Sequence, residues 1–347
     1  MIKNYFTFLL FCVVTLFGCN KKIANAITEN PEVTNPTSYF SVGADVSWVT
    51  QMEAANKLFY NAAGQQRECI ALLKELGANT VRLRVWVNST TAYNTTADVV
   101  TKAVRAKNLG MRILIDFHYS DTWADPGAQI KPAAWATQNI AALKISLASH
   151  TNVVLTELKN NGITPEWVQI GNETNDGMLW PEGKASTNMS NFAQLINAGY
   201  DAAKNVFPNT KVIVHISNGY DNNLFRWIFD GLKNNGAKFD VIGLSLYPSY
   251  FGGGWAEANT KCLANMNDMI ARYDKEVFVV EVGMPWDAAA DCKAFLTDLI
   301  SKTKSIPNKK GLGVLYWEPQ AYANWQGYTL GAFDNTGKPT IALDAFR

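Results

Sequence analysis

The stretch TVRLRVWV, residues 80–87, decides the fold of this chain. Arg82, Arg84 and Trp86 alternate there with aliphatic residues, and successive side chains of a β-strand point to opposite faces. The aliphatic face has to pack against helices, so the face with the two arginines and the tryptophan has to look into the interior of the sheet. Two guanidinium groups in such an interior need carboxylate partners. The candidate partners are Asp45, Asp116 and Glu281.

Seven further runs of the chain are short and largely apolar, as strands buried on both faces are. They lie at residues 42–46, 111–119, 166–173, 211–217, 240–248, 276–283 and 313–319. Longer stretches of helical character separate them, among them residues 69–77, 98–110, 152–162, 191–206 and 291–304. Strands that alternate with helices favour a parallel sheet. Eight such units predict an α/β fold of the closed (β/α)8 TIM-barrel type, in a single domain over residues 39–347. The competing fold is an open doubly wound sheet, but no glycine-rich phosphate loop follows the first strand.

Several of the predicted strands turn polar at their C-terminal ends. The residues concerned are Asp116, His118, Asn172, Glu173, Glu281 and Glu318. In a barrel of this kind the C-terminal ends of the strands form the catalytic face. Buried polar and ionisable groups are costly unless they have partners or a chemical task. The pattern therefore predicts an active site at this end of the barrel.

Two of these residues, Glu173 and Glu281, end the fourth and the seventh strand. Two carboxyl groups that converge from separate strands are what cleavage of a glycosidic bond needs. One has to be protonated and donate to the leaving oxygen, while the other has to be ionised and attack the anomeric carbon. The alternative is that either glutamate is a structural partner of an arginine in the barrel.

The arginines and His118 are candidates for supporting this pair. Arg84 lies closer to the predicted mouth than Arg82, and an arginine beside a nucleophilic glutamate lowers its pKa. We therefore expect Arg84 or another donor to keep Glu281 ionised; the alternative is a structural ion-pair network. His118 is expected to bind a substrate hydroxyl or to orient a carboxylate, with a satisfied core histidine as the alternative. His215 is interpreted as a structural residue inside its strand.

Aromatic residues gather in the segments that follow the predicted strands. They are Trp86, Trp123, Trp180, Tyr247, Tyr250, Trp255, Trp286, Trp317, Tyr322 and Trp325. Aromatic rings stack on the apolar faces of sugars, so the cluster indicates a carbohydrate cleft; the alternative is that the rings plug the barrel rim. The formal net charge of the 347-residue chain is +1. This balance gives no basis for nucleic-acid or anionic-membrane binding and suits a neutral substrate.

The first residues have the layout of an export signal. Lys3 precedes a short apolar run that ends at Cys19, and this run is too short to cross a bilayer. Residues 1–18 resemble a bacterial lipoprotein signal peptide, which makes Cys19 the lipid-bearing residue; the alternative is ordinary secretion with a later cut. Residues 19–38 read as a flexible tether. The chain is thus expected to be exported and lipid-anchored to a cell-envelope membrane.

The remaining cysteines allow two interpretations. Cys69, Cys262 and Cys292 cannot all pair, and their spacing fits no metal motif. A Cys262–Cys292 disulfide is possible in an exported protein, and buried free thiols are the alternative.

Eight motifs together resemble glycoside hydrolase family 53, the arabinogalactan endo-β-1,4-galactanases. They are GADVSW (43–48), VRLRVW (81–86), DFHYSDTWADPG (116–127), QIGNET (169–174), GMLWPEG (177–183), GLSLYP (243–248), VVEVGMPW (279–286) and LYWEP (315–319). The resemblance covers nearly all of residues 39–347. It implies a retaining endo-hydrolase of β-1,4-galactan, the side chain of pectin, with Glu173 as acid/base and Glu281 as nucleophile. It also implies that Asn172 binds the 2-hydroxyl beside the cleaved bond and that Trp317 floors the same sugar site.

Motifs and resemblance together yield one set of expected substrate-binding residues. The set is Asp45, Arg84, Trp86, His118, Trp123, Asn172, Tyr247, Trp286 and Trp317. The expected ligands are β-1,4-galactan and galacto-oligosaccharides, and the protein is expected to be a monomer. Some bacterial members carry a calcium-binding insertion, but residues 291–311 lack a run of acidic ligands, so we expect no metal and no cofactor. Two other functions stay open: a mannanase or glucanase of the same clan, and a non-catalytic surface glycan-binding lipoprotein.

Overall fold

Eight parallel strands close into a barrel in the order β1-β10-β9-β8-β7-β6-β5-β4. This computed structural model describes Met1 and residues 39–347, so the expectations for residues 2–38, including Cys19, lie outside the described residues. The strands are β1 (Ser41–Asp45), β4 (Thr80–Val85), β5 (Arg112–Phe117), β6 (Trp167–Ile170), β7 (Lys211–Ile216), β8 (Val241–Leu246), β9 (Glu276–Val282) and β10 (Gly311–Trp317). Each falls within or beside one of the eight predicted runs, so the (β/α)8 barrel is confirmed.

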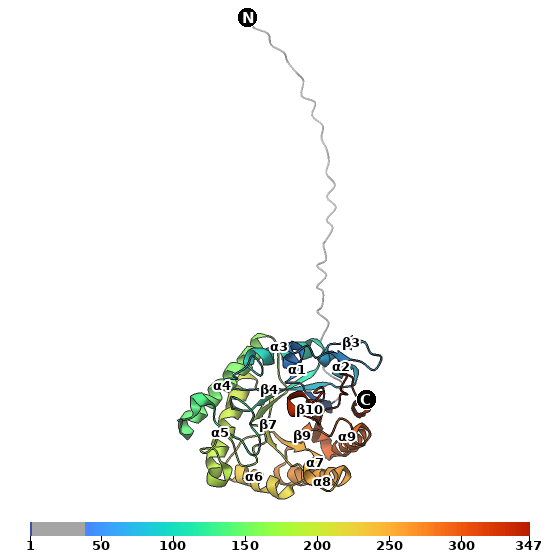
Figure 1. The fold of residues 1–347 in the computed structure, drawn as a ribbon. Coiled ribbons are helices and arrows are strands. Elements are labelled where there is room, and N and C mark those ends of the chain that lie inside the picture. The colour runs from blue at the N-terminus through green and yellow to red at the C-terminus, as the bar shows by residue number, and fades with distance from the viewer. Residues whose placement is uncertain (2–38) are drawn as a thin grey trace, which may run out of the picture. The chain divides into compact units, whose positions relative to one another are not determined.

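Helices surround the barrel as an outer ring (Figure 1). They are α1 (Val49–Ala54), α2 (Cys69–Glu75), α3 (Thr96–Asn108), α4 (Ile140–Asn160), α5 (Ala185–Val206), α6 (Asn222–Asn234), α7 (Pro248–Phe251), α8 (Trp255–Tyr273) and α9 (Ala289–Lys304). All five helical stretches named from the sequence are present, and α4 begins well before the predicted start. After β10 the ring is completed by a 3-10 helix, Ile341–Phe346, which packs against α9.

A small two-stranded sheet was not predicted. It pairs β2 (Phe59–Tyr60) with β3 (Gln66–Arg67), between α1 and α2. The Tyr60 amide donates to the Gly337 carbonyl at 2.9 Å, which ties this hairpin to the C-terminal segment. Strands of two residues carry too little hydrophobic periodicity to be seen in a sequence.

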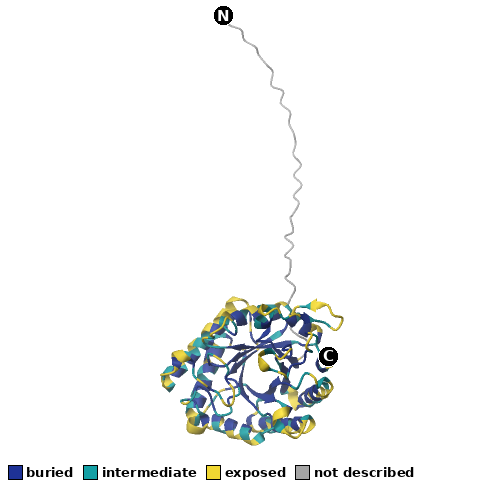
Figure 2. Ribbon diagram, in the orientation of Figure 1, coloured by how far each residue is buried: buried dark blue, intermediate teal, exposed yellow. Residues whose placement is uncertain are grey.

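The hydrophobic core has two parts, one outside and one inside the barrel. Outside, the outward strand faces pack against the helices, and Figure 2 shows the resulting buried inner layer with exposed residues on the outer surface of the ring. Inside lies a second cluster: Leu114, Trp167, Ile213, Val241, Phe278, Val280, Leu312 and Leu315. The apolar side chains thus fill the interior of the barrel, and the polar layer lies above them, nearer the C-terminal ends of the strands.

The alternation in residues 80–87 is confirmed by the contacts of Arg82. Its guanidinium reaches Asp45 on β1, Asp116 on β5 and Glu281 on β9, all at 3.0 Å or less. A side chain that meets three strands around the barrel lies in the interior. The aliphatic neighbours Val81, Leu83 and Val85 belong to the outer core, against the helices.

A β-bulge in β9 sets the direction of Glu281. Against β8, Val279 pairs with Leu244 and Glu281 pairs with Ser245, so β9 carries one extra residue at this point. The same extra residue appears against β10, where Val279 pairs with Val314 and Val282 with Tyr316. Val280 and Glu281 are neighbours in sequence, yet Val280 belongs to the interior cluster and Glu281 contacts the interior Arg82. Bulges beside active sites commonly re-aim a side chain in this way.

Two smaller findings complete the description. Cys69, Cys262 and Cys292 are all free and buried, so no disulfide joins Cys262 to Cys292. Within residues 39–347, no helix has the length and apolar character needed to cross a membrane.

Candidate active site

A cavity of about 490 Å³ opens at the C-terminal ends of the strands, and both predicted catalytic glutamates line it. Its wall also contains His118, Trp123, Ala124, Asp125, Pro126, Asn172, Ser217, Asn218, Tyr247, Tyr250, Trp317, Tyr328 and Leu330. Glu173 follows β6, and Glu281 lies near the end of β9. Side chains that are far apart in sequence meet here because all eight strands end on the same face.

Glu281 sits between a cation and a phenol. Its Oε1 lies 2.8 Å from Arg82 Nη1, and its Oε2 accepts a hydrogen bond from the Tyr247 hydroxyl at 3.3 Å. Burial and the neighbouring carboxylates raise the pKa of the Glu281 carboxyl to about 8, against the opposing effect of the Arg82 guanidinium. Arg82 is fully buried and stays protonated, so the ion pair favours the charged form of Glu281.

Glu173 has no cation at ion-pair distance among the described residues. Its Oε1 accepts a hydrogen bond of 2.6 Å from the Ser245 hydroxyl. Burial raises the pKa of this carboxyl to about 7, against the opposing effects of Ser245 and Arg82. Two carboxyls in one cavity thus have different surroundings, which is how one fold holds an acid and a nucleophile at the same pH.

The backbone at Glu173 is strained. Its φ is +44°, in the left-handed region that residues with a β-carbon rarely occupy. The Gln129 side-chain amide donates to the carbonyl of Asn172 at 2.8 Å, and the Asn175 amide donates to the carbonyl of Glu173 at 2.8 Å. Strain that its surroundings hold in place is concentrated at functional sites.

Below the two glutamates lies a hydrogen-bonded layer centred on Arg82. Gln169 accepts from its Nε and Nη2 at 3.2 Å, and the Asn172 side-chain oxygen accepts from Nη2 at 2.8 Å. Gln169 in turn donates to Asp116 at 2.6 Å. Asn172 donates to the carbonyl of Ala124 at 2.7 Å, so its amide is fixed in one orientation. A buried network in which the members satisfy one another is rigid.

His118 joins this layer with a defined tautomer. The Ala124 amide donates to its Nδ1 at 3.1 Å, so the ring hydrogen resides on Nε2 and is donated to Asp116 at 2.9 Å. Burial lowers the pKa of His118, so the ring is neutral. Its neighbour Trp123 lies edge-on to it, with ring centroids 6.2 Å apart.

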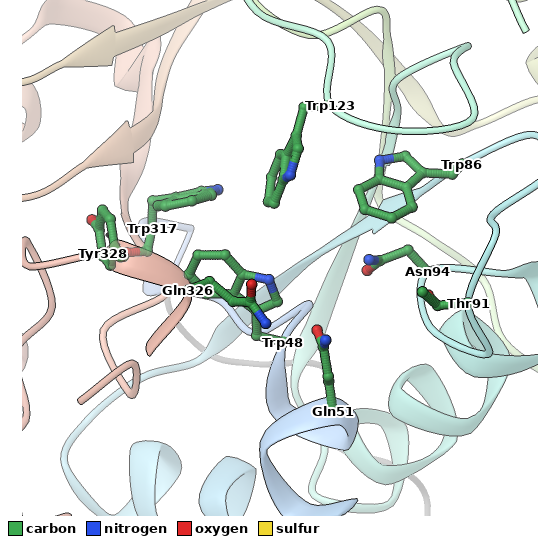
Figure 3. Close-up of a pocket in the computed structure, with 10 residues that line it drawn as sticks. Trp48, Gln51, Trp86, Thr91, Asn94, Trp123, Trp317, Gln326 and Tyr328 are labelled. Atoms are coloured by element: carbon green, nitrogen blue, oxygen red, sulfur yellow. Dashed lines mark hydrogen bonds between the residues drawn. The ribbon is translucent and has the colours of Figure 1, made fainter. Parts of the chain in front are cut away.

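A second cavity of about 370 Å³ adjoins the first and is walled by tryptophans (Figure 3). Its lining is Trp48, Gln51, Trp86, Thr91, Asn94, Trp123, Trp317, Gln326, Gly327 and Tyr328. Trp123, Trp317 and Tyr328 also line the catalytic cavity, so the two hollows share a wall. Trp48 contacts both Trp123 and Trp317, with ring centroids 5.7 and 5.0 Å apart.

Arg84 supports these tryptophans. Its guanidinium lies 4.2 Å from the ring centre of Trp123 and 5.6 Å from that of Trp86, which is cation–π geometry. Its ion-pair partner is Glu318, at 3.4 Å. Arg82 occupies the place beside Glu281, so Arg82 is the donor that the sequence left open as Arg84 or another residue. Side-chain direction on neighbouring strands, and not distance from the mouth, decides which arginine meets Glu281.

The comparisons with known proteins agree with this geometry. The family model of glycosyl hydrolase family 53 matches residues 41–294 and 288–346. An arabinogalactan endo-β-1,4-galactanase of Cellvibrio japonicus is 35% identical over 327 residues, which cover 85% of this chain and 84% of that protein. The chain belongs to glycoside hydrolase family 53.

Relatives of this family-53 chain include fungal proteins. An arabinogalactan endo-β-1,4-galactanase of Thermothelomyces thermophilus is 34% identical over 301 residues, covering 80% of this chain and 88% of the relative. A solved fungal β-1,4-galactanase superimposes with a TM-score of 0.82 at 31% identity, over 88% of this chain and 98% of the other. The family-53 catalytic domain of Ignisphaera aggregans gives a TM-score of 0.80 at 30% identity, over 90% and 97% of the two chains.

Most of the residues predicted for the family-53 site lie on its two cavities. Trp86 lines the tryptophan-walled cavity, and the two glutamates line the catalytic one together with His118, Trp123, Asn172, Tyr247 and Trp317. Asp45 and Arg84 are fully buried and reach neither cavity, so they act through the residues that they hold. Trp286 lines neither cavity; its amide donates to the carbonyl of Thr329 at 3.1 Å.

The sequence interpretation missed three members of the family-53 site. Gln169 belongs to the buried layer around Arg82, Trp48 walls the second cavity, and Ser245 touches Glu173. His215, interpreted as structural, bonds to Ser245 at 2.8 Å. The sequence did contain a signal for Ser245 and His215, because each is a polar residue on the inward face of an otherwise apolar strand. Within residues 39–347, no group of three or more His, Cys, Asp or Glu side chains is placed to hold a metal ion.

Proposed function

We propose that this chain is a retaining endo-hydrolase of β-1,4-galactan, with Glu173 as acid/base and Glu281 as nucleophile. The observation that carries the proposal is the asymmetry of the two carboxyls in one cavity. Glu281 is held by a buried guanidinium at 2.8 Å, and Glu173 is held by a neutral hydroxyl. Membership of family 53 and the galactanase names of the relatives support galactan as the substrate.

The protonation states follow from the contacts. Two interacting carboxyls lose their protons in two steps that belong to the pair. Burial raises the pKa of both carboxyls, so the pair keeps one proton up to near-neutral pH. We assign that proton to Glu173, because the guanidinium of Arg82 lies 2.8 Å from Glu281 and stabilises the charge there, while Glu173 has no such cation among the described residues. The pair is then poised as one anion and one acid.

The reaction proceeds by two displacements. Glu281 attacks the anomeric carbon while Glu173 protonates the glycosidic oxygen, so the C–O bond breaks and a galactosyl ester forms on Glu281. Glu173, now a carboxylate, takes a proton from water while the water oxygen attacks the anomeric carbon, and the bond from that carbon to Glu281 breaks. Two inversions give net retention, which requires a carboxyl separation of about 5–5.5 Å.

The two cavities give the cleft a direction. Asn218 and Tyr250 line the catalytic cavity together with Glu173 and do not line the tryptophan-walled cavity, and the leaving group has to lie beside the acid. The tryptophan-walled cavity continues from the shared residues Trp123 and Trp317 to Trp48 and Trp86, which do not line the catalytic cavity with Glu173 (Figure 3). We infer that the sugars on the non-reducing side of the cleaved bond stack in the tryptophan-walled cavity. Two adjoining cavities that share Trp123, Trp317 and Tyr328 offer room for several sugars, which fits cleavage within a polysaccharide chain.

The test of this function is a product profile over time from linear β-1,4-galactan, with mannan and glucan digested in parallel. The proposal predicts a spread of galacto-oligosaccharide sizes at early times and no release of reducing ends from the other polymers. Preferred cleavage of mannan or glucan would assign the chain to another substrate. Binding to galactan without any release of reducing ends would make it a glycan-binding protein.

We also propose export and lipid anchoring, on the basis of the N-terminal sequence alone. Residues 1–18 with Cys19 have the layout of a lipoprotein signal, and a lipid on Cys19 anchors a protein without spanning the membrane. Incorporation of labelled palmitate into the full chain in a bacterial host, and its loss in Cys19→Ala, tests this. Equal labelling of the two chains would exclude Cys19 as the site.

A further inference from the structure

His215 and Ser245 form a hydrogen-bonded chain that ends on Glu173. His215 Nε2 lies 2.8 Å from Ser245 Oγ, and Ser245 Oγ lies 2.6 Å from Glu173 Oε1. His215 is fully buried on β7, and Ser245 is almost fully buried on the neighbouring β8. The family-53 mechanism stated above uses neither residue. The effect of these two hydrogen bonds on Glu173 depends on which atoms carry the hydrogens.

The direction in which these two hydrogen bonds are donated is set by the other ring nitrogen of His215, Nδ1. The backbone amide of Glu173 lies 3.3 Å from His215 Nδ1 with donor geometry, and a backbone amide can only donate. The side-chain amide of Gln169 is a second donor, 3.1 Å from Nδ1. Within residues 39–347, the one acceptor that faces Nδ1 is the Asn172 oxygen at 3.1 Å, and Arg82 already donates to that oxygen at 2.8 Å. His215 Nδ1 is therefore the bare, accepting nitrogen.

A bare Nδ1 places the ring hydrogen on Nε2. Burial and the nearby Arg82 lower the pKa of His215 well below its usual value, so the ring carries a single hydrogen. That hydrogen is donated to Ser245 Oγ. A serine hydroxyl has one hydrogen of its own, and with His215 as donor the hydrogen of Ser245 is directed to Glu173 Oε1.

The consequence for Glu173 concerns its two oxygens. Oε1 accepts from Ser245 whether the carboxyl is ionised or neutral, so a proton on Oε1 would face the hydrogen of Ser245. Oε2 borders the cavity and has no hydrogen-bond partner within residues 39–347. A proton on Glu173 therefore resides on Oε2, the oxygen that a ligand in the cavity can reach.

We propose that His215 and Ser245 are positioning residues that hold the catalytic proton of Glu173 on Oε2; this rests on the proposed role of Glu173 as acid/base. In the first displacement, the Oε2 proton moves to the glycosidic oxygen, which also receives the electron pair of the broken C–O bond. Glu281 supplies the pair that forms the new bond to carbon. The Ser245 hydroxyl then stabilises the new Glu173 carboxylate through Oε1. In the second displacement, the proton of water returns to Oε2.

Other groups also act on Glu173 and have to stay constant in a test. The charged and titratable groups that face it are Arg82, Asp116, Asp125, His215, Tyr247 and Glu281. Only His215 among them bonds to Ser245, and its ring is neutral, so a substitution of Ser245 leaves the charges of the other five groups in place. A shift in the titration of Glu173 in a Ser245 variant therefore reports the hydroxyl contact.

The first experiment reads the tautomer of His215 directly. The chain contains three histidines, so ¹⁵N-histidine NMR of the whole protein gives few signals, and His215→Asn assigns those of His215. The proposal predicts a protonated Nε2 and a bare Nδ1 over the pH range in which the protein is active. A protonated Nδ1 on His215 would overturn it. This readout needs no substrate, so it stands even if the chain does not cleave galactan.

The second experiment removes the hydroxyl. Ser245→Ala is predicted to raise the pKa of Glu173, so the alkaline limb of kcat/KM on galactan moves to higher pH. It is also predicted to slow galactan cleavage roughly tenfold, the worth of a hydrogen bond to a charged group. Hydrolysis of an aryl galactobioside with a good leaving group, which does not need the acid, should change by less than about twofold. Ser245→Thr keeps the hydroxyl and should restore the position of the limb.

The matched control is Thr303→Val, which removes an equally buried hydroxyl that bonds only within α9, to the carbonyl of Leu299 at 2.8 Å. It should leave the pH limb and the ratio of the two substrates unchanged. An unchanged limb in Ser245→Ala, or an equal loss on both substrates, would refute the positioning role. Should Ser245→Ala not fold, the NMR tautomer decides alone. An inactive wild-type protein would refute the proposed function, and the His215 tautomer measured by NMR would then be the test of the His215–Ser245 hydrogen bonds.

Discussion

Glu173→Gln should make the protein more stable, and only above acidic pH. Gln has the shape of the protonated carboxyl and can keep accepting from Ser245 through its oxygen. In the native protein, burial raises the pKa of Glu173 to about 7, while in the unfolded chain the carboxyl titrates near its usual value of about 4.5. Between these two pH values the unfolded state releases its proton first, so the free energy of unfolding falls as pH rises.

The size of the effect follows from the same two values. Each pKa unit is worth about 1.4 kcal/mol, so full ionisation of a buried Glu173 costs at most roughly 3 kcal/mol. Part of the Glu173 surface is open to the cavity, and solvent there screens the charge, so we expect about 2 kcal/mol. Below pH 4 both proteins carry a neutral group at this position, and their stabilities should agree to within about 0.5 kcal/mol.

The assay is urea unfolding of residues 39–347 at pH values from 4 to 8.5. The stabilisation by Glu173→Gln should appear between pH 4.5 and 7 and then level off. The matched control is Glu157→Gln on the outside of α4, an exposed glutamate that should show no such pH dependence. A difference between Glu173→Gln and wild type that is constant over the whole range would refute the reasoning, because it would mean that Glu173 titrates as it does in water.

Three further predictions follow from the site. Glu281→Ala should abolish cleavage of galactan while the circular dichroism spectrum and the unfolding transition stay those of a folded barrel; activity within a few-fold of wild type would remove Glu281 from the nucleophile role. Arg82→Met should lower the free energy of unfolding by about 3–5 kcal/mol at pH 7, because three buried carboxylates lose their common cation. The loss should be smaller at pH 4, where Glu281 is protonated; equal losses at both pH values in urea unfolding would contradict this. Trp86→Ala should raise KM for long galactan chains more than for galactotriose, because Trp86 lines only the tryptophan-walled cavity; an equal change in both, measured by reducing-end release, would place Trp86 outside the cleft.

The barrel and its mouth could be predicted because the relevant information is local. Eight apolar runs and their polar C-terminal ends are visible one strand at a time, and the alternation in residues 80–87 correctly places both arginines inside. What each arginine meets depends on the register of neighbouring strands. For that reason the sequence left open whether Arg84 or another donor stabilises Glu281, and the structure shows Arg82 beside it.

The direction in which the Glu281 side chain points could not be predicted from the alternation of residues along the strand. Phe278 and Val280 belong to the interior cluster, so strict alternation along β9 would have turned Glu281 towards the helices. The extra residue in β9 reverses this, and no single residue type marks the bulge in the sequence. His215 and Ser245 illustrate the same limit, since their role arises from the contact of β7 with β8 and not from either strand alone.

The most direct test of the account is to trap the intermediate. A 2-deoxy-2-fluoro galactobioside with a good leaving group slows both displacements but the second one more, so a covalent galactosyl-enzyme should accumulate. Peptide mapping by mass spectrometry should locate the added mass on the peptide that contains Glu281, one sugar chain per protein. An adduct on any other carboxylate, or rapid turnover with inverted anomeric configuration and no adduct, would contradict Glu281 as the nucleophile of a retaining enzyme.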